Sequence, residues 1–89
     1  MKNYRKIERI VRSFSNHRRI EILELVKKTP ELSVMDIAEE LKINFKTASE
    51  HIRRLAISGL VMKRNDGPAV CHKITPLGNS ILMFLRTLE

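Results

Sequence analysis

The sequence is short of several residue types, and each shortage excludes a class of protein. Its single cysteine, Cys71, rules out an intramolecular disulfide and a cysteine-rich zinc site, which favours a reducing compartment. Tryptophan is absent and only four aromatic residues occur, too few for the stacking surface of a protein that binds single-stranded nucleic acid. The longest unbroken apolar run covers residues 81–85, and the charged residues 1–12 lack an apolar signal-peptide core. We therefore expect a cytoplasmic protein with no membrane partner.

The chain is long enough for one domain only. Its 89 residues bury a thin core, because folding at this size removes roughly 60% of the surface that the unfolded chain exposes. The composition, 43% hydrophobic and 30% charged, is typical of a globular protein. We therefore expect a single domain over residues 1–89 that gains further burial by forming an oligomer.

Positive charge is both large and unevenly distributed. The net charge is +7, with +6 in residues 1–19, −3 in residues 20–45 and +4 in residues 46–73. Basic blocks separated in this way are typical of a protein whose partner is a polyanion. Because aromatic residues are so few, double-stranded DNA is the expected partner.

Apolar spacing and capping residues predict four helices in the first 57 residues. Apolar residues three or four apart make the first helix amphipathic, and Ser, Asn and Asp side chains stand where the next three begin. A short connection joins the third and fourth helices, so together they form a helix-turn-helix. The residues expected to begin or end these helices are Phe14, Ser15 or Asn16, Thr29-Pro30, Ser33 with Asp36 in a capping box, and Asn44.

The rest of the chain predicts a wing and a last helix. Gly59 supplies the left-handed residue that ends the fourth helix. Strands over residues 60–64 and 69–74 flank residues 65–68, whose Asp-Gly pair is a hairpin turn signal. Thr75-Pro76 then begins the last helix with a cap and a proline at its first position. The predicted fold is mainly α with a small β-hairpin, a winged helix-turn-helix of order α-α-α-α-β-β-α.

The fourth helix carries the face expected to contact DNA. Ala48, Ile52 and Leu55 recur at helical spacing and face inward, so the polar residues between them face outward. On the second helix of a helix-turn-helix, beside a cationic wing, such residues contact bases and phosphates. The predicted DNA-binding residues are Arg18, Arg19, Asn44, Phe45, Lys46, Thr47, Ser49, Glu50, Arg53, Arg54, Lys63, Arg64 and Lys73.

Several of these residues have an alternative role. Glu50 either accepts a hydrogen bond from cytosine or pairs with one of the two arginines that follow it, and the ion pair is favoured. Phe45 either touches a thymine methyl group or packs over the turn, and packing is favoured. Thr47 and Ser49 either contact DNA or solvate the first turn of the helix.

Two apolar stripes near the ends of the chain exceed what a thin helix-turn-helix core can cover. An isologous interface between two copies would bury both stripes. We therefore expect a homodimer. The predicted interface residues are Tyr4, Ile7, Val11, Phe14, Leu77, Ile81, Phe84, Leu85 and Leu88.

Residues 41–61, LKINFKTASEHIRRLAISGLV, resemble the arsenical-resistance repressor (ArsR) family of winged-helix proteins, and the similarity covers roughly residues 14–74. Residues 74–78, ITPLG, are instead similar to the multiple-antibiotic-resistance (MarR) and phenolic-acid (PadR) regulator families. The resemblance implies a homodimeric repressor of a pseudo-palindromic operator, with helix 45–57 in the major groove and wing 60–74 on the backbone or minor groove. The family pattern T-x-S-x-H-L-x-x-L followed by Gly-Leu-Val is matched by Thr47, Ser49, His51, Ile52, Leu55, Gly59, Leu60 and Val61.

The resemblance does not extend to metal sensing. Metal sensors of the family carry cysteines where this chain has Ser33 and Met35, and others use Asp and His on the last helix, which here has neither. We therefore expect no metal and no cofactor, and whether a small-molecule effector exists stays open. No Ser-His-Asp arrangement, phosphate-cradling glycine loop or carboxylate pair indicates an enzyme.

The alternative function is a winged-helix protein-interaction module without specific DNA binding. A docking surface of that kind would carry fewer cations than Lys46, Arg53 and Arg54 place on one helix face. The composition therefore favours DNA over a protein partner.

Overall fold

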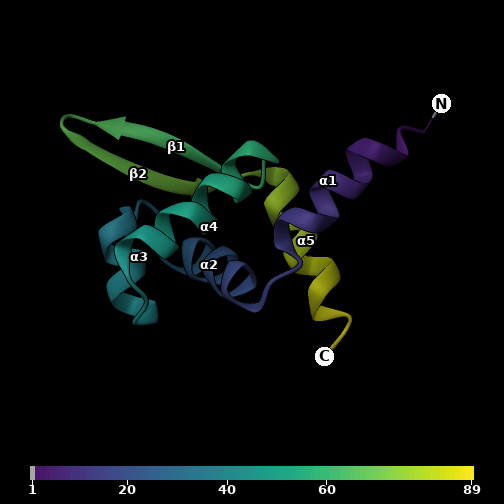
Figure 1. Ribbon diagram of the computed structural model, residues 1–89, viewed down its shortest axis with the longest axis horizontal. Coiled ribbons are helices and arrows are strands. Elements are labelled where there is room, and N and C mark those ends of the chain that lie inside the picture. Colours follow the sequence, from purple (N-terminus) through teal and green to yellow (C-terminus); the bar gives the residue numbers. More distant parts are fainter. Residues whose placement is uncertain (1) are drawn as a thin grey trace.

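The computed structural model describes residues 2–89, and this part of the chain forms five helices and a two-stranded antiparallel hairpin (Figure 1). The order of the elements confirms the predicted winged helix-turn-helix. None of the described helices is long and apolar enough to cross a membrane. The elements are α1 (Tyr4–Phe14), α2 (His17–Lys28), α3 (Val34–Leu41), α4 (Phe45–Ile57), β1 (Val61–Asp66), β2 (Ala69–Ile74) and α5 (Pro76–Arg86).

The predicted capping residues begin four of the five helices described. Asn16 accepts hydrogen bonds from the first amides of α2, and Ser33 forms a reciprocal capping box with Asp36 on α3. Asn44 and Thr75 begin α4 and α5 as simple caps, in which the side-chain oxygen of each accepts one backbone amide of the first turn. Because each cap satisfies backbone amides within three residues, sequence spacing was enough to predict these helix starts.

A Schellman motif ends α4. Gly59 has a φ of 80°, a left-handed conformation that glycine adopts without a side-chain clash. Its amide donates to the carbonyl of Ala56 at 3.0 Å, and the amide of Leu60 donates to the carbonyl of Leu55 at 2.9 Å. The chain therefore leaves the helix in a fixed direction and enters the wing at Val61.

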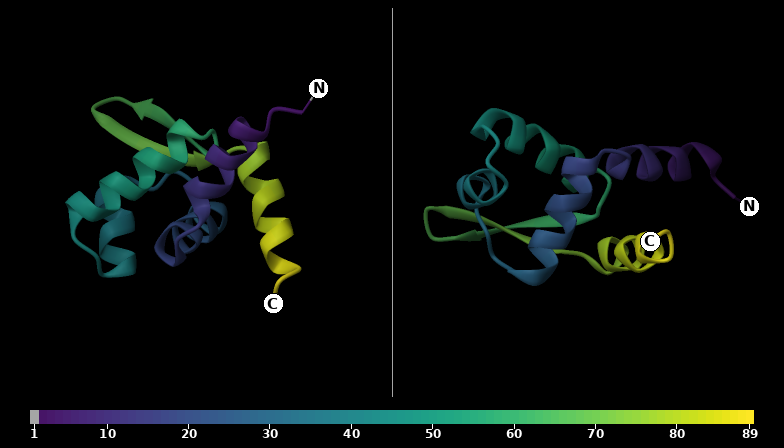
Figure 2. Two further views of the ribbon diagram at one scale, coloured as in Figure 1. Left: turned by 45° about the vertical axis from the view of Figure 1, so that its right-hand side comes forward. Right: turned by 90° about the horizontal axis from the view of Figure 1, so that it is seen from below.

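The core lies around α2, which has α3 and α4 on one side and α5 on the other (Figure 2). Every helix and the base of the wing contribute an apolar side chain to it. The buried residues of this core are Phe14, Ile22, Leu23, Val26, Ile37, Ile52, Leu55, Leu60, Val61 and Leu82.

One predicted interface residue is corrected by this core. Phe14 is 7% exposed and belongs to the interior of its own protomer, because the last turn of α1 packs on α2. Ile81 and Leu85 are half-buried against the same core, whereas Leu82 is the fully packed residue of α5. The unpartnered apolar surface is therefore narrower than the spacing alone predicted.

The hairpin turn differs by one residue from the prediction. Asp66 pairs with Ala69, so the two-residue loop is Gly67-Pro68 and not a turn centred on Asp66-Gly67. Gly67 has a φ of 62°, the positive value that a type II′ turn needs at its first central position. Proline suits the second position because its φ is fixed near −65°. The wing consequently extends further from the body than strands ending at residue 64 would.

A buried histidine anchors the base of the wing. His72 is 1% exposed, and its Nδ1 lies 2.9 Å from the carbonyl oxygen of Leu32, which also accepts the His72 amide at 3.0 Å. The amide of Glu31 donates in turn to the His72 carbonyl at 3.0 Å. These bonds fix β2 to the segment between α2 and α3.

Candidate nucleic-acid interface

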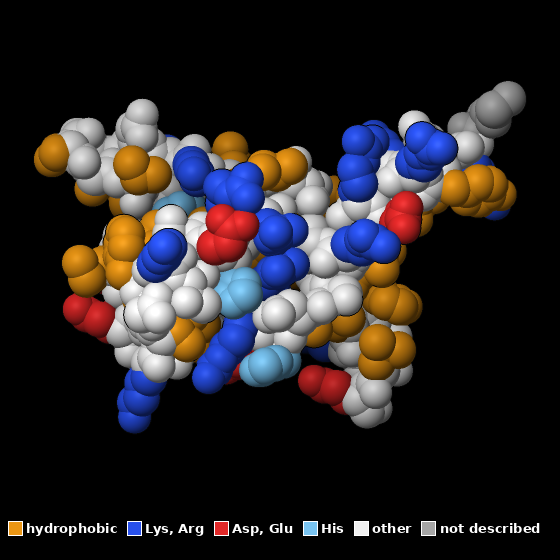
Figure 3. All heavy atoms as spheres, viewed as in Figure 1, with side chains coloured by type: hydrophobic (Ala, Val, Ile, Leu, Met, Phe, Trp, Pro, Cys, Tyr) orange, Lys and Arg blue, Asp and Glu red, His pale blue; other side chains and the backbone are white. Residues whose placement is uncertain are grey.

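The inner face of α4 determines which residues face outward. Ala48, Ile52 and Leu55 are fully buried against the core, as predicted. With that face fixed, Lys46 is exposed and Ser49 is half-exposed. Figure 3 shows Lys and Arg side chains gathered on this side of the molecule over α4 and α1, with acidic side chains among them.

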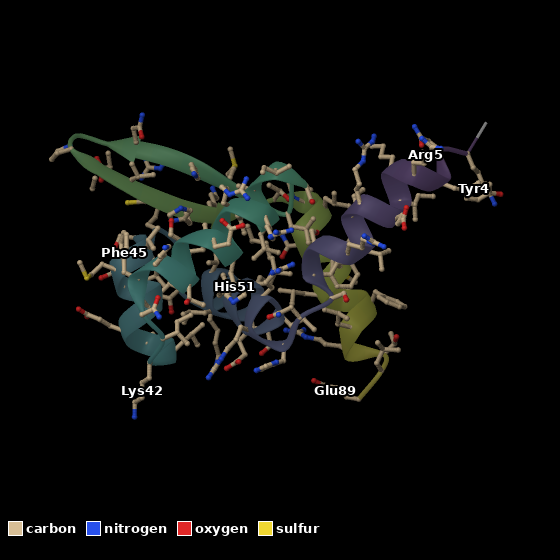
Figure 4. The ribbon with its side chains drawn as sticks, in the orientation of Figure 1. Tyr4, Arg5, Lys42, Phe45, His51 and Glu89 are labelled. Atoms are coloured by element: carbon tan, nitrogen blue, oxygen red, sulfur yellow. The ribbon has the colours of Figure 1, made fainter. Side chains whose placement is uncertain are left out.

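The first turn of α4 divides its polar groups between capping and the exterior. The Asn44 side-chain oxygen accepts the Thr47 amide at 2.7 Å, so this oxygen is occupied in the cap. Phe45, labelled at the start of α4 in Figure 4, has 53% of its surface exposed. Packing over the turn therefore accounts for only part of this ring, and contact with a thymine methyl group stays a prediction.

The structure shows one of the two roles considered for Glu50. Its carboxylate accepts hydrogen bonds from Arg53 Nε at 3.0 Å and Arg53 Nη2 at 2.8 Å, and from Arg54 Nε at 3.2 Å. The hydrogen bonds from Arg53 are the main cause that lowers the pKa of Glu50 to about 2. The favoured intrahelical ion pair is therefore present, and it holds both arginines on the helix surface.

Arg19 is half-buried and its guanidinium makes hydrogen bonds within the protein, so its contact with DNA stays a prediction. Its Nε donates to His51 Nδ1 at 3.1 Å, and its Nη1 donates to the carbonyls of Arg12 and Ser13 at 3.4 and 3.3 Å. The guanidinium thereby joins the ends of α1 and α2 to α4. Arg18 lies beside it and pairs with Glu21 at 3.2 Å.

The wing places its cations on two faces. Residues directly opposite in an antiparallel pair share a face, and neighbours along a strand alternate. The register pairs Lys63 with His72 and Arg64 with Cys71, so Lys63 lies on one face while Arg64 and Lys73 lie on the other. The prediction treated these three cations as one group.

An ion pair of Arg64 also ties the wing to the body. Glu31 accepts its Nη2 at 2.7 Å and its Nε at 3.1 Å, and these hydrogen bonds lower the pKa of the carboxyl. Residues 31 and 64 are far apart in sequence, and no local spacing predicts their contact. Glu31 therefore positions the wing through a contact that the sequence did not reveal.

Within residues 2–89 no group of three or more His, Cys, Asp or Glu side chains is placed to hold a metal ion. Cys71 is half-exposed on β2, whereas the neighbouring His72 is buried, so the two side chains point to opposite faces. The described part of the chain therefore offers no ligand set of the kind that zinc needs.

Comparison with known proteins identifies the family. The family model of bacterial regulatory proteins of the arsR family matches residues 16–63. The chain belongs to the ArsR family. This confirms the resemblance drawn from residues 41–61, and the class is one of DNA-binding transcriptional regulators and not of enzymes.

Relatives of known sequence and structure agree with this family. An uncharacterized HTH-type transcriptional regulator of Methanocaldococcus jannaschii, MJ1325, is 33% identical over 67 residues, which are 75% of each chain. HlyU from Vibrio cholerae superposes with a TM-score of 0.82 at 26% identity, covering 98% of this chain and 95% of HlyU. The winged helix-turn-helix domain of Mb0332 from Mycobacterium bovis, described as homodimeric and as a possible ArsR-family regulator, gives a TM-score of 0.82 at 28% identity. That match covers 96% of this chain and 78% of the other.

Proposed function

We propose that this ArsR-family protein is a homodimeric repressor that reads a pseudo-palindromic operator in double-stranded DNA. Residues 45–57 would enter the major groove, and the wing, residues 60–74, would lie on the backbone or minor groove. The observation that carries this proposal is the division of α4 into a buried face and an outer face that presents Lys46, Thr47 and Ser49. The first residues of a recognition helix are the ones that reach base edges.

The charges around α4 support binding to phosphates. Lys46, Lys63 and Lys73 are exposed, and no carboxylate among residues 2–89 forms an ion pair with any of them. Such cations gain affinity by releasing counterions from the DNA, so binding would weaken steeply with added salt. Base contacts from the first turn of α4 would then supply sequence preference.

Exposed apolar residues on α1 and α5 support the homodimer. Tyr4, Ile7 and Val11 are exposed along one stripe of α1. Phe84 in the last turn of α5 and Leu88, which follows that helix, are exposed as well. A second copy related by a two-fold axis would bury both stripes at once. The homodimeric description of the Mycobacterium bovis domain supports the same arrangement. Two recognition helices related in this way would read half-sites about one helical turn apart, roughly 34 Å.

Repression follows from the way such a dimer would occupy DNA. A dimer spanning two successive major grooves covers one face of the duplex, which excludes polymerase when the operator overlaps a promoter. The test is in vitro transcription from a template carrying an operator obtained by selection from random duplexes. Loss of transcript with rising protein supports repression, and increased transcript contradicts it.

Base reading is separated from phosphate binding by two kinds of variant. Lys46→Ala or Ser49→Ala should reduce the preference for operator over scrambled duplex, because a good base contact contributes about 1–3 kcal/mol of discrimination. Lys63→Ala should weaken binding to both duplexes alike and make the salt dependence shallower. Lys28→Ala, at the end of α2, is the control of equal charge. Equal selectivity in all four variants would contradict DNA reading by α4 and favour a protein-docking role.

The dimer has its own test. Phe84→Glu places a charge in the proposed interface and should give a monomer in sedimentation experiments at micromolar concentration, whereas the wild type sediments as a dimer. Val70→Glu is the matched control, because Val70 is exposed on the wing. A wild-type monomer at that concentration would overturn the dimer.

A further inference from the structure

A basic hollow opens where the end of α1, the start of α2 and the end of α4 meet. Its volume is about 340 Å³. Five of the residues that line it are arginines, and none of its lining residues is acidic. The arginines of this basic hollow are Arg9, Arg12, Arg19, Arg53 and Arg54.

Nearby carboxylates neutralise only part of this charge. Glu8 pairs with Arg12 at 3.5 Å between two exposed side chains, a contact of the kind that contributes little in water. Glu50 pairs with Arg53 and Arg54. Two carboxylates therefore face five guanidinium groups, and the basic hollow keeps an excess of positive charge.

Burial and, after it, the neighbouring positive charge act on two titratable groups beside the hollow. Burial and then the charge of Arg54 lower the pKa of Arg19. Burial and then the charge of Arg19 lower the pKa of His51. Each group sits in a positive potential that an anion in the hollow would relieve.

α1 continues the basic surface away from the hollow. Arg5, Arg9 and Arg12 follow one another at spacings of four and three, so they share one face of the helix. At 100° per residue this face lies opposite the apolar stripe that includes Ile7 and Val11. Burial of that stripe against a second copy would therefore leave the arginines outward. Figure 4 shows Arg5 near the start of α1, on the side of the ribbon away from Glu89.

We propose that the basic hollow is a phosphate-binding site, and that its ligand is a backbone phosphate of the DNA just outside the half-site read by α4, on the side of the two-fold axis, because α1 also carries the proposed dimer interface. This proposal rests on the proposed function. α4 has 13 residues and is about 20 Å long, longer than the roughly 12 Å width of the major groove. With its first turns on the base edges, the last turn carries Arg53 and Arg54 to the groove wall, where the phosphates lie.

The arrangement favours a polymeric phosphate over a small free anion. A guanidinium donates two parallel hydrogen bonds to phosphate oxygens, so the hollow itself suits one phosphate group. The row of arginines, however, continues to Arg5, outside the hollow. A single small anion leaves this row unused, whereas a DNA strand presents successive phosphates along it.

The test compares two operator duplexes that differ only in the charge of the phosphates between the half-sites. The double variant Arg9→Gln/Arg12→Gln removes the α1 half of the hollow, and Lys28→Gln/Arg86→Gln is the control with the same loss of charge. The Arg12 atom that accepts from Arg19 is the backbone carbonyl, so this bond survives the substitution. Binding is measured by fluorescence anisotropy at several salt concentrations. One duplex has a natural backbone, and the other carries uncharged methylphosphonates in place of the phosphates between the two half-sites.

On the natural duplex the Arg9/Arg12 variant should show a salt slope smaller by about 0.9 for each phosphate that the variant no longer neutralises, with unchanged preference for operator over scrambled sequence. On the methylphosphonate duplex it should bind like the control variant. Equal slopes for the two variants on the natural duplex, or an equal weakening on both duplexes, would overturn the proposal. Failure of the proposed function would be seen in a different measurement, because Lys46→Ala would then leave the preference for operator over scrambled duplex unchanged.

A second experiment tests whether the ligand of the basic hollow is free phosphate and not a DNA phosphate. Thermal unfolding is followed with inorganic phosphate against chloride at equal ionic strength. The DNA assignment predicts the same small effect in wild type and in the Arg9/Arg12 variant. A stabilisation specific to phosphate that the variant loses, together with equal DNA salt slopes, would overturn the assignment and identify a site for a free anion.

Discussion

The carboxylate of Glu50 accepts two hydrogen bonds from the guanidinium of Arg53, at 2.8 and 3.0 Å, across one turn of the recognition helix. The same carboxylate accepts a third from Arg54. The two arginines of α4 are therefore paired within the helix in the absence of DNA. In the proposed function a phosphate would compete with Glu50 for them, which would limit binding to duplexes that supply no base contacts.

Replacing Glu50 should consequently raise affinity and lower selectivity. Glu50→Gln keeps the shape of the side chain but removes its charge, so both arginines become available to phosphates. Anisotropy should give tighter binding to operator and scrambled duplexes, with a salt slope steeper by about 0.9 for one additional neutralised phosphate. Glu39→Gln, on the exposed side of α3, changes the net charge equally. If both variants tighten binding to the same extent, the pairing with Glu50 does not restrain the arginines.

The burial of His51 beside Arg19 makes stability depend on pH. Burial and the charge of Arg19 hold the pKa of His51 below its ordinary value of 6.5. As the pH falls below about 6.5, the unfolded chain therefore binds this proton before the folded chain does. The contribution of neutral His51 to the free energy of unfolding should be complete above that pH. It should decrease as the pH falls toward and through the lowered pKa.

The variant that checks this dependence is His51→Asn. Its side-chain oxygen can replace Nδ1 as the acceptor for Arg19 but does not titrate. Urea unfolding between pH 5 and pH 8 should show a smaller loss of stability on acidification than in the wild type. His17→Asn, at an exposed position, should behave like the wild type. A loss of stability in His51→Asn as large as the wild type's would assign the pH dependence to other groups.

The local signals in this sequence were enough for the fold but not for every part of the surface. Ser33 with Asp36 and Thr75 with Pro76 determine helix starts through contacts within three residues, so spacing reveals them. The predicted position of the hairpin turn differs from the observed one because an Asp-Gly pair and a Gly-Pro pair both satisfy local turn rules. Only the pairing of the two strands decides between them.

Long-range contacts explain what the sequence did not reveal. Arg19 donates to a residue 32 positions away, and Arg64 pairs with one 33 positions away. Spacing within one helix or strand carries no information about either contact. The row of arginines on α1 was visible as a spacing of four and three, but only the fold brings Arg9 and Arg12 beside the end of α4.

The buried histidine of the wing should be replaceable by an aromatic residue. His72 Nε2 is buried and has no hydrogen-bond partner among residues 2–89, while the Leu32 carbonyl also accepts the His72 amide. His72→Phe therefore loses one side-chain hydrogen bond but removes an unsatisfied polar atom, and its unfolding free energy should stay within about 1 kcal/mol of the wild type. His72→Ala leaves a cavity and should cost about 2–4 kcal/mol. Urea unfolding distinguishes the two, and a large loss of stability in His72→Phe would show that the ring nitrogens are essential to the wing.

DNA binding should be insensitive to zinc, cadmium and arsenite under reducing conditions. Ser33 and Met35 stand where metal sensors of the ArsR family have cysteines, and Cys71 and His72 point to opposite faces of β2. One half-exposed thiol without converging imidazoles supplies too few ligands for these ions. The measurement is anisotropy of the protein on its selected operator with each metal at stoichiometric and about tenfold excess. Metal-dependent loss of binding that a chelator reverses would contradict the prediction. If the Cys71→Ser variant showed the same metal-dependent loss, the ligands would be shared between the two subunits.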